Sequence, residues 1–574
     1  MQSNTLDSKC FVPSSDIEFP YIEAKRIETR LHIMLKPIKI MDIELGCPLT
    51  TIENLGNYDA LQGLVRLHDT PIGYIKVPVA NGCCTATTLG KAILEKHSKA
   101  ILHHLLCDGL ATRHPSDGFC ITDLLAIQHP VYNGPLPLVT VAVCTRNRTD
   151  DLARCLDSLN KLDYPSLDVL VVDNAPGNDA TEHLVRMRYP GMCYVREPRT
   201  GLDWARNRAI IEARGEIIAY TDDDVVVDPG WVKALAVVFS ENPEVLAVTG
   251  LVVPYELETE AQIFFELRGG FGKRFKRTWY QMNQENGKQT ATLYGFSDMF
   301  GAGANMAFRR RLFDQIGYFD PALDVGTATK GGGDMEMFFR VLKKGYTLVY
   351  EPGAVVRHCH RRNYAQLRKQ MASWGTSFYA YIMRNAIAYP DERFAFIRLG
   401  LWFLRFQIRR LLNSFVHPPG YPRDMLLTQL FSSFLGPICY LKARRAAAKI
   451  AQDFGPITQV AAADMPTLRK MTTNRQNTIA ERTVDLNQPL HTLTDVSDYP
   501  VVRVLVTRNS YTLGSVDIVN NHTSVSVAWL RDAIVENLNF LLLEPDNNSD
   551  MNSLQTNLLK ILTQHYIMEN VEAG

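Results

Sequence analysis

Three consecutive aspartates, Asp222, Asp223 and Asp224, follow a short apolar segment, residues 216–220, which is preceded by Gly215. The apolar, β-rich composition of this segment predicts a buried strand. Three carboxylates at the end of one strand repel each other, and a bound cation relieves that repulsion. Carboxylate oxygens suit Mg²⁺ or Mn²⁺, which also bind diphosphates. The sequence therefore predicts a divalent cation site here, the alternative for an isolated acidic triplet being a solvated turn.

The region before the aspartates alternates between predicted strands and helices. Residues 138–143 and 167–172 predict two buried strands that end in polar residues, and a helix follows each of them. A strand at residues 193–195 and a helix at residues 201–213 complete the series. This alternation predicts an α/β domain with a mostly parallel sheet and a site along the carboxyl ends of its strands. No Gly-x-Gly-x-x-Gly motif follows the first strand, so dinucleotide binding is not favoured.

Length and composition limit the possible classes of protein. The 574 residues are too many for one core and predict three or four domains. Lys+Arg and Asp+Glu both number 61, so no global field favours nucleic acid, and any membrane attraction must be local. The eleven cysteines contain no Cys-x-x-Cys pair, which predicts a reducing compartment rather than a disulfide framework or structural zinc. The first twenty residues lack a signal-peptide core, so we expect a cytoplasmic protein.

Seven short motifs occur in an order that resembles the successive motifs of family 2 glycosyltransferases. They are Cys144-Thr145-Arg146-Asn147-Arg148, Val172-Asp173-Asn174, residues 201–207, residues 221–224, residues 303–309, residues 317–320 and residues 331–337. The resemblance covers about residues 137–385. It implies the GT-A fold, which is Rossmann-like, a nucleotide-diphosphate sugar donor, a divalent metal and inversion at the anomeric carbon.

The resemblance also implies which residues contact the donor. Thr145, Arg146 and Asp173 would line the nucleotide pocket, with Asp173 accepting a hydrogen bond from the base. Arg206, near the start of its helix, would reach the nucleotide or its phosphates. The alternative for Arg206 is an ordinary exposed arginine on a helix.

Under the same resemblance the acidic triplet divides its roles. Asp222 and Asp224 take the metal-binding and ribose-binding role, with Asp224 the first choice for direct ligation, and Asp223 joins Asp222 in contacting the donor. Further along, alternation puts His358 and His360 on one face if their segment is extended. Such histidines can complete the metal shell or hold the pyrophosphate, the alternative being a basic surface patch. The metal, Mn²⁺ or Mg²⁺, would act as a Lewis acid on the departing diphosphate.

The base for the acceptor hydroxyl is expected after a triple-glycine loop. Family members carry Glu-Asp-x-Glu or Glu-Asp-x-Asp there, whereas this chain has Gly333 in place of the first acid. Asp334 matches the aspartate and is assigned as the general base, although helix capping alone would also explain it. Glu336 matches the later acid and is assigned as an acceptor contact or secondary candidate. Asn305 is placed on the acceptor side.

Residues 1–135 predict an α+β accessory module without a catalytic constellation. Its predicted elements are strands at residues 26–33, 61–67 and 72–79 and a helix at residues 89–106. We interpret three of its histidines as surface or helix-packing residues and not as metal ligands. They are His97, His103 and His104.

The end of the chain resembles its beginning. Residues 505–530 align with residues 64–89 without gaps. Residues 491–574 are therefore predicted to form a second copy of the N-terminal module with a role in docking or pairing, the alternative being chance similarity between two short α+β stretches.

The region after the predicted catalytic domain, residues 136–385, is helical in pattern. This region comprises residues 386–450. Residues 394–415 form an apolar run that arginines interrupt. Residues 425–441 are uncharged but too short to span a membrane. This pattern predicts helices on an anionic membrane face, the alternative being helices packed on the protein itself. Residues 451–490 predict a linker.

These observations predict an inverting, non-processive transferase that moves one sugar from a nucleotide-diphosphate sugar to a hydroxyl acceptor, in cell-surface polysaccharide or glycoconjugate synthesis. The lack of a Gln-x-x-Arg-Trp motif favours transfer of single sugars. One alternative is a sugar-nucleotide pyrophosphorylase, but the chain has no glycine-rich N-terminal loop followed by Arg and Lys. Another is a catalytically silent scaffold of an envelope-assembly complex, against which the aspartates of the site argue.

Overall fold

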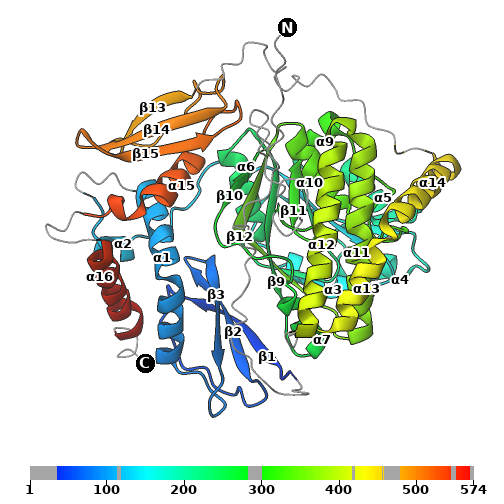
Figure 1. Cartoon of the computed structure of the whole chain (residues 1–574), viewed down its shortest axis with the longest axis horizontal. Helices are drawn as coiled ribbons and strands as arrows, with labels where there is room; N and C mark the ends of the chain where they lie inside the picture. The colour runs from blue at the N-terminus through cyan, green and yellow to red at the C-terminus, as the bar shows by residue number, and fades with distance from the viewer. Residues whose placement is uncertain are drawn as a thin grey trace, which may run out of the picture.

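A computed structural model describes residues 35–112, 118–281, 300–416, 421–455, 457, 479–544 and 551–568. In these residues one large sheet and two small sheets carry the fold. Figure 1 shows the two small sheets on one side of the large sheet and a group of long helices on the other. The strand predicted at residues 26–33 lies outside the described residues.

The large sheet has nine strands, in the order β10-β12-β9-β11-β7-β4-β5-β6, with β8 paired to β12. They are β4 (Val139–Thr145), β5 (Leu167–Asn174), β6 (Cys193–Glu197), β7 (Ile217–Asp222), β8 (Val225–Val227), β9 (Val245–Pro254), β10 (Thr278–Tyr280), β11 (Met306–Arg309) and β12 (Thr347–His358). Strands β4, β5, β6 and β7 pair in parallel, as do β9 and β12, whereas β8, β10 and β11 are antiparallel to their neighbours. The mostly parallel α/β sheet expected from the sequence is confirmed.

Helices cover both faces of this sheet, which explains why its strands are continuously apolar. One face carries α3 (Thr149–Leu159), α4 (Ala180–Arg188) and α6 (Trp231–Glu241), and the other carries α5 (Leu202–Glu212), α9 (Leu312–Ile316) and α10 (Gly333–Lys343). Along β4, Val141 and Val143 enter one core, whereas Ala142 enters the other, as the two-residue period of a strand requires. The polar ends of the strands are left at the edge.

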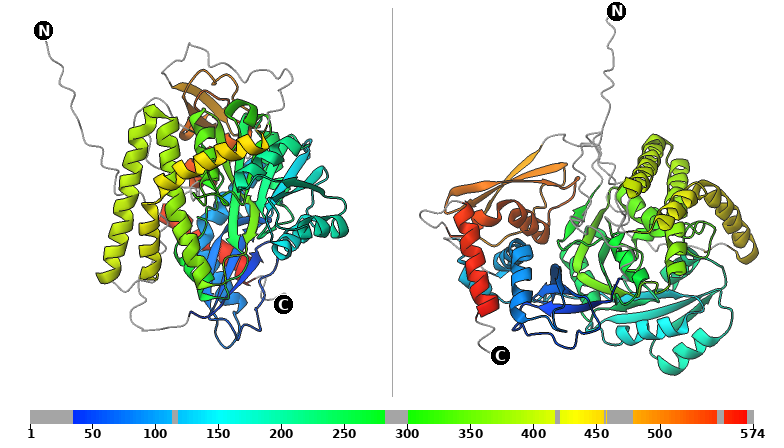
Figure 2. Two further views of the ribbon diagram at one scale, coloured as in Figure 1. Left: turned by 90° about the vertical axis from the view of Figure 1, so that its right-hand side faces the viewer. Right: turned by 60° about the horizontal axis from the view of Figure 1, so that its bottom comes forward.

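Four helices pack together beside the sheet: α11 (Tyr364–Ala388), α12 (Arg393–Val416), α13 (Arg423–Ser433) and α14 (Gly436–Phe454). Figure 2 shows them as one layer. Glycine permits close approach, because a Cβ at Gly436 would lie 2.6 Å from the carbonyl oxygen of Thr376 on α11. None of the described helices is long and apolar enough to cross a membrane. The linker predicted at residues 451–490 is too long, since α14 runs to Phe454 and β13 begins at Ala480.

The two small sheets have the same topology. The first consists of β1 (Ile38–Glu44), β2 (Ala60–Leu67) and β3 (Thr70–Pro78), and it is followed by α1 (Ala86–Thr112) and α2 (Ile121–Leu125). The second consists of β13 (Ala480–Asp485), β14 (Val501–Arg508) and β15 (Tyr511–Val519), and it is followed by α15 (Val527–Leu538) and α16 (Met551–Thr563). In each, a parallel pair precedes an antiparallel pair. Three C-terminal elements start 441 residues after their counterparts: β14 at 501 against 60, β15 at 511 against 70, and α15 at 527 against 86. Duplication of the module stays a prediction, with this matching topology as its structural support.

The N-terminal and C-terminal modules share one hydrophobic core. Helix α1 packs against both α15 and α16, so the two modules lie side by side in Figures 1 and 2. This joint body is attached to the catalytic domain partly by Trp529, which stacks on Trp279 with ring centroids 4.9 Å apart.

Candidate active site

The aspartates predicted from the sequence lie at the carboxyl edge of the large sheet. In the parallel pairing of β4 with β7, Cys144 lies opposite Asp222. The hydroxyl of Thr145 donates to Asp223 Oδ2 at 2.8 Å, and Arg148 donates to Asp223 Oδ1 at 2.6 Å. Asp223 therefore uses both oxygens on donors of the protein itself, whereas Asp224 accepts from Arg148 at 3.0 Å through Oδ2 alone, which leaves Asp224 Oδ1 and Asp222 as the better cation ligands.

Burial makes these carboxylates costly to ionise without a cation. Asp224 is 3% exposed, whereas Asp222 is partly exposed. Burial and the charge of Asp224 raise the pKa of Asp222 to about 7, and burial raises the pKa of Asp223 to about 6 although Arg148 opposes it. Burial also acts on Asp224, but the positive charges of Arg148 and Arg361 lower its pKa below the ordinary value. The edge therefore holds an ionised carboxylate next to one that a positive charge would ionise.

A histidine pair follows at the end of β12, which runs through Pro352. His360 Nε2 lies 2.8 Å from Glu266 Oε1, and His360 Nδ1 lies 3.0 Å from His358 Nδ1. Although Glu266 is buried, Lys273 and His360 lower its pKa to about 2, so Glu266 accepts and His360 Nε2 donates. His360 Nδ1 must then accept from His358 Nδ1.

This chain of hydrogen bonds fixes the tautomer of His358. Its Nε2 is left with a lone pair 3.4 Å from Asp224 Oδ1. Burial lowers the pKa of His358 to about 4, so the ring is neutral at neutral pH. A lone pair that faces a carboxylate at this distance fits a cation between them. His360 has a partner at each ring nitrogen, which favours a role in positioning His358, and its role as a ligand stays a prediction.

Asp334, the predicted base, lies at the start of α10 and is partly exposed. Its two oxygens accept from the backbone N–H groups of Gly303 and Met335, each at 2.8 Å. Burial and the charge of Asp324 raise its pKa above the ordinary value. The carboxylate is therefore held in one orientation while it stays within reach of a substrate.

Arg206 lies between the two acidic parts of the site. It is 4% exposed and donates to Asp203 Oδ1 at 3.0 Å and to Asp324 Oδ2 at 2.5 Å, so it is not an ordinary exposed arginine. The charges of Asp222 and Asp334 also act on it. Arg206 is thus a fixed positive charge at the floor of the site.

The structure gives a reason for the missing acid at position 333. A Cβ on Gly333 would overlap Asp203 Oδ2, so no side chain fits there. Asp203 is fully buried, its Oδ2 has no hydrogen-bond partner, and burial raises its pKa well above the ordinary value. The carboxyl group of Asp203 therefore occupies the space next to Asp334 that a side chain at 333 would need.

Two predicted residues do not face the site. Glu336 is fully buried and pairs with Arg340 and Arg384, the latter at 2.8 Å, so its predicted acceptor contact is wrong. Asn305 is also fully buried: its Oδ1 accepts from Trp231 Nε1 at 2.8 Å, and its Nδ2 donates to backbone carbonyls of β9 and β12. Its placement on the acceptor side is wrong for the same reason.

On the predicted nucleotide side, Asp173 lies opposite Thr145 in the pairing of β4 with β5. Tyr194 donates to Asp173 Oδ2 at 2.9 Å, while Oδ1 is buried without a well-aligned partner. Burial raises the pKa of Asp173, although Tyr194 and Thr181 oppose this. Arg146 is exposed beside the same strand end. Both residues therefore lie at the edge where the sequence placed them.

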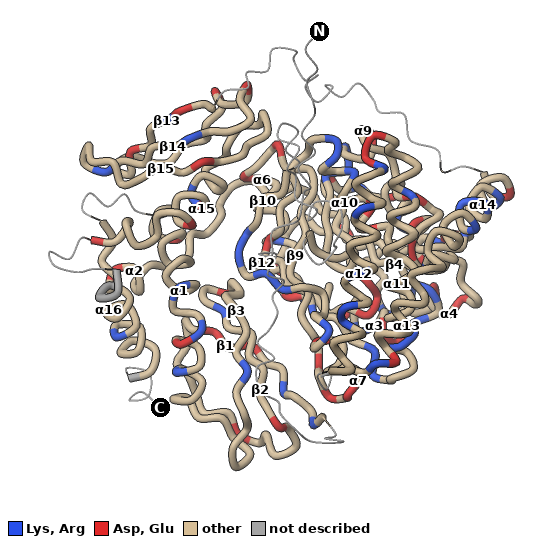
Figure 3. The backbone as a smooth tube through the Cα atoms, in the orientation of Figure 1, with Lys and Arg blue, Asp and Glu red and all other residues tan. Residues whose placement is uncertain are grey.

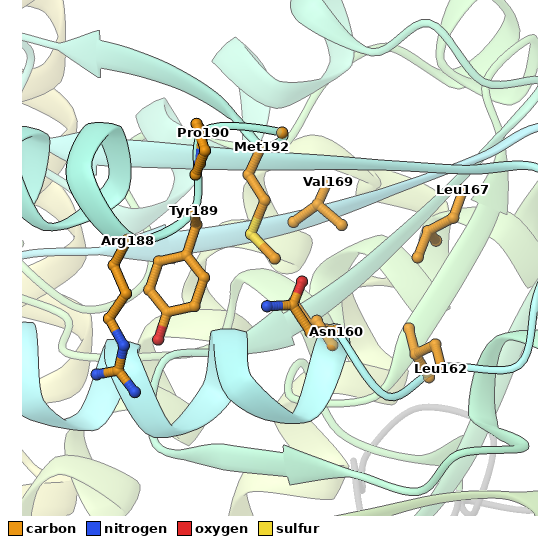
Figure 4. A pocket seen from close by; sticks show the side chains of 10 residues that line it. Asn160, Leu162, Leu167, Val169, Arg188, Tyr189, Pro190 and Met192 are labelled. Atoms are coloured by element: carbon orange, nitrogen blue, oxygen red, sulfur yellow. The ribbon is translucent and has the colours of Figure 1, made fainter.

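A cavity of about 350 Å³ lies elsewhere, at the opposite ends of the strands. Its lining includes Leu167 and Val169 at the start of β5, together with Asn160, Tyr189 and Met192 (Figure 4). The aspartates follow the carboxyl ends of the strands, so this cavity is separate from the candidate active site.

Comparison with known proteins agrees with this site. Residues 140–317 match Glycosyl transferase family 2. The chain is 25% identical over 243 residues to polypeptide N-acetylgalactosaminyltransferase 5 of Caenorhabditis elegans, covering 40% of this chain and 38% of that protein. It is 23% identical over 240 residues to glucosyl-dolichyl phosphate glucuronosyltransferase of Haloferax volcanii, covering 38% of this chain and 68% of that protein. A mannosyltransferase structure from Pyrobaculum calidifontis aligns at 17% identity over 64% of this chain and 87% of its own, with a TM-score of 0.31, too low to argue from.

Residues 140–317, about a third of the chain, are therefore similar to a family 2 glycosyltransferase domain. The chain spans less than two fifths of the nematode relative and about two thirds of the archaeal one.

Proposed function

We propose that this protein is a metal-dependent, inverting glycosyltransferase that moves one sugar from a nucleotide-diphosphate donor to a hydroxyl acceptor. The observation that supports this most strongly is the neutral His358, whose lone pair faces Asp224 beside a second carboxylate, Asp222. Two carboxylates and one imidazole suit Mn²⁺ or Mg²⁺. When bound there, such an ion would supply Lewis-acid stabilisation of the diphosphate leaving group.

The residues around this edge have distinct roles in the proposal. Asp173, at the carboxyl end of β5 and fully buried before the donor binds, is the proposed acceptor of a hydrogen bond from the nucleotide base. Thr145 and Arg148 hold Asp223 and so fix the backbone of the acidic triplet. Arg206 stabilises negative charge that develops between Asp222 and Asp334.

Asp334 is the proposed general base. Two backbone N–H groups orient its carboxylate, and it is the acid of its motif that is partly exposed. It removes the proton from the acceptor hydroxyl as that oxygen attacks the anomeric carbon. Attack on the side opposite the diphosphate inverts the configuration there.

We further propose that helices α12–α14 lie on an anionic membrane surface and that the acceptor is a membrane-associated glycoconjugate, with the protein cytoplasmic and peripheral. Apolar side chains exposed on these helices include Phe394, Ile397, Leu401, Leu412, Phe415, Phe431, Phe434, Leu435 and Ile438. Exposed among them are the basic residues Arg398, Arg405, Arg409, Lys442, Arg444, Arg445 and Lys449, of which those on α14 appear blue in Figure 3. Basic and apolar groups on one surface match anionic headgroups and the hydrocarbon below them. The archaeal relative, whose name includes a dolichyl phosphate, fits such an acceptor.

Incubation of the purified protein with Mn²⁺ and single nucleotide sugars tests the reaction. Release of nucleoside diphosphate that depends on added acceptor lipid or polyol is expected, together with a product of inverted configuration by NMR. A pyrophosphorylase would instead need pyrophosphate, and a silent scaffold would release nothing. Either of these two results contradicts the proposal.

Sedimentation with vesicles tests the membrane surface. Binding to vesicles that contain phosphatidylserine is expected, and it should fall with salt. The double variant Phe434→Gln/Ile438→Gln should reduce binding, whereas Met187→Gln, which changes an exposed apolar residue on α4, should not. Equal binding by both variants would mean that α12–α14 contact something other than lipid.

A further inference from the structure

Four side chains of the N-terminal module converge outside the candidate active site. His68 lies in the turn between β2 and β3, His104 and Asp108 lie one turn apart on α1, and His129 lies between α2 and β4. One nitrogen from each imidazole and one carboxylate oxygen all lie within 4.8 Å of one another. His104, interpreted from the sequence as a surface or packing residue, thus has partners from segments that are distant in sequence.

These four residues, the histidine–aspartate cluster, have the spacing of a tetrahedral metal site. Asp108 Oδ2 is 2.9 Å from His68 Nδ1 and 3.1 Å from His104 Nε2. His129 Nδ1 lies 3.0 and 3.1 Å from the two oxygens of Asp108. The nitrogens of His68 and His104 are 3.3 Å apart. With zinc bonds of about 2.0–2.1 Å, the edges of a tetrahedron are about 3.3 Å long.

A shared cation accounts for this arrangement at least as well as hydrogen bonds do. If His68 Nδ1 and His104 Nε2 both donated to Asp108 Oδ2, their hydrogens would be in van der Waals contact, because the two nitrogens are only 3.3 Å apart. Lone pairs that point at one shared cation bring no hydrogens together. Three neutral imidazoles and one carboxylate suit zinc, whereas Mg²⁺ and Ca²⁺ prefer oxygen ligands.

The backbone at His68 supports a special role for its side chain. His68 has a φ of 53°, in the left-handed region. The corresponding residue of the C-terminal module, 441 positions later, is Asn509, with a φ of 50°. Asparagine and histidine both adopt this conformation more readily than most residues, so the turn permits either side chain. The contacts with Asp108 and His104 are what distinguish the imidazole at position 68.

We propose that the histidine–aspartate cluster binds one structural zinc ion. The side chain of Asp108 is 5% exposed and that of His104 13%, whereas His129 is 47% exposed and leaves a path of entry. The ion would join three segments: the β2–β3 turn, α1 and the segment that leads into the catalytic domain.

The joined turn lies against the strands that carry the active site. Arg66, two residues before His68, donates to Asp228 Oδ2 at 2.6 Å and pairs with Asp42 at 2.9 Å. Asp228 follows β8, and Asp42 also pairs with Arg357, the neighbour of His358, at 2.6 Å. The zinc site would therefore brace β8, which begins just after Asp224, and β12, which ends in His358.

Zinc content of the tag-free, full-length protein tests this proposal. After growth with zinc and desalting, about one zinc per chain is expected by mass spectrometry in the wild type. The same content is expected in Asp224→Asn, which removes the sheet-edge site, and in His183→Gln, which changes an exposed histidine on α4. His68→Asn should lose the zinc and lower the unfolding midpoint by at least about 2–4 °C. Asparagine is chosen because Asn509 already occupies the same turn.

Cobalt gives a test that needs no variant. Co²⁺ added to zinc-free wild-type protein should show the strong visible absorption of tetrahedral coordination, and zinc should abolish it. A wild type without zinc, zinc retained in His68→Asn, or only the weak absorption of octahedral Co²⁺ would each overturn the proposal.

Discussion

The chain offers two candidate cation sites of opposite character. The sheet-edge site, made of Asp222, Asp224 and His358, is rich in carboxylate and is partly open. The histidine–aspartate cluster around Asp108 is rich in imidazole and mostly enclosed. Hard oxygen ligands with an open side suit an ion that is exchanged with substrate, whereas a closed nitrogen-rich set suits an ion that stays. The difference shows how one chain can separate a catalytic ion from a structural one by ligand chemistry.

Asp334→Asn should cause the largest loss while leaving both cation sites intact. The transfer rate should fall by about 10²–10⁴, because the acceptor loses its base, and donor affinity should stay near normal. Rate, donor affinity by calorimetry and zinc content are measured together. Asp314→Asn, on the surface of α9, is the matched control. If Asp334→Asn stays active, the base lies elsewhere.

Asp224→Asn should separate the two sites. Affinity for Mn²⁺ in the presence of a nucleotide sugar should fall by more than about 100-fold. Loss of a direct ligand lowers metal affinity more than loss of a residue that only orients a ligand. Zinc content should not change. Parallel titrations with Mn²⁺ and mass spectrometry for zinc measure the two effects, and a joint loss would mean that the sites are coupled or that the fold has changed.

Glu266→Gln should weaken the sheet-edge site without removing a ligand. Glu266 fixes the hydrogen of His360 and, through it, the lone pair of His358. A partner of this kind typically contributes about 10–100-fold to metal affinity. Titration of activity with Mn²⁺ measures the shift, and near-normal kcat at saturating Mn²⁺ is expected. An unchanged titration would show that His358 keeps its tautomer without Glu266.

Arg66→Lys should have the smallest effect and tests whether the sites communicate. Lysine keeps the charge but cannot pair with Asp42 and Asp228 at once. We expect kcat within about tenfold of the wild type and a lower unfolding midpoint, by about 2–4 °C for each 1 kcal/mol lost. A larger fall in kcat than in stability would make the N-terminal module part of the catalytic apparatus.

The sequence predicted those site residues that a local sequence pattern marks. Asp222 to Asp224 follow a buried strand, and Asp334 begins a helix after glycines, so these positions are recognisable without coordinates. The errors at Glu336 and Asn305 share one cause: a motif identifies a residue type but not whether its polar atoms are already paired inside the protein.

The omissions have a different cause. Glu266 lies 94 residues from the histidine it orients, and no local pattern links them. His129 lies 21 residues from Asp108 across a helix end and a loop, with no spacing that marks it as a ligand. Arg148 could have been found from the sequence, since a basic residue just after β4 is positioned to reach the acidic edge.

The shared core of the terminal modules has a consequence during synthesis. Helix α1 is complete at residue 112, but α15, which covers it, begins only at residue 527. At about 5–20 residues per second, the ribosome needs on the order of 20–80 s to make the difference. For that time Leu102 and Leu106 lack their final partners and face the cell interior or a chaperone. The N-terminal module, although made first, is thus expected to reach its native packing last.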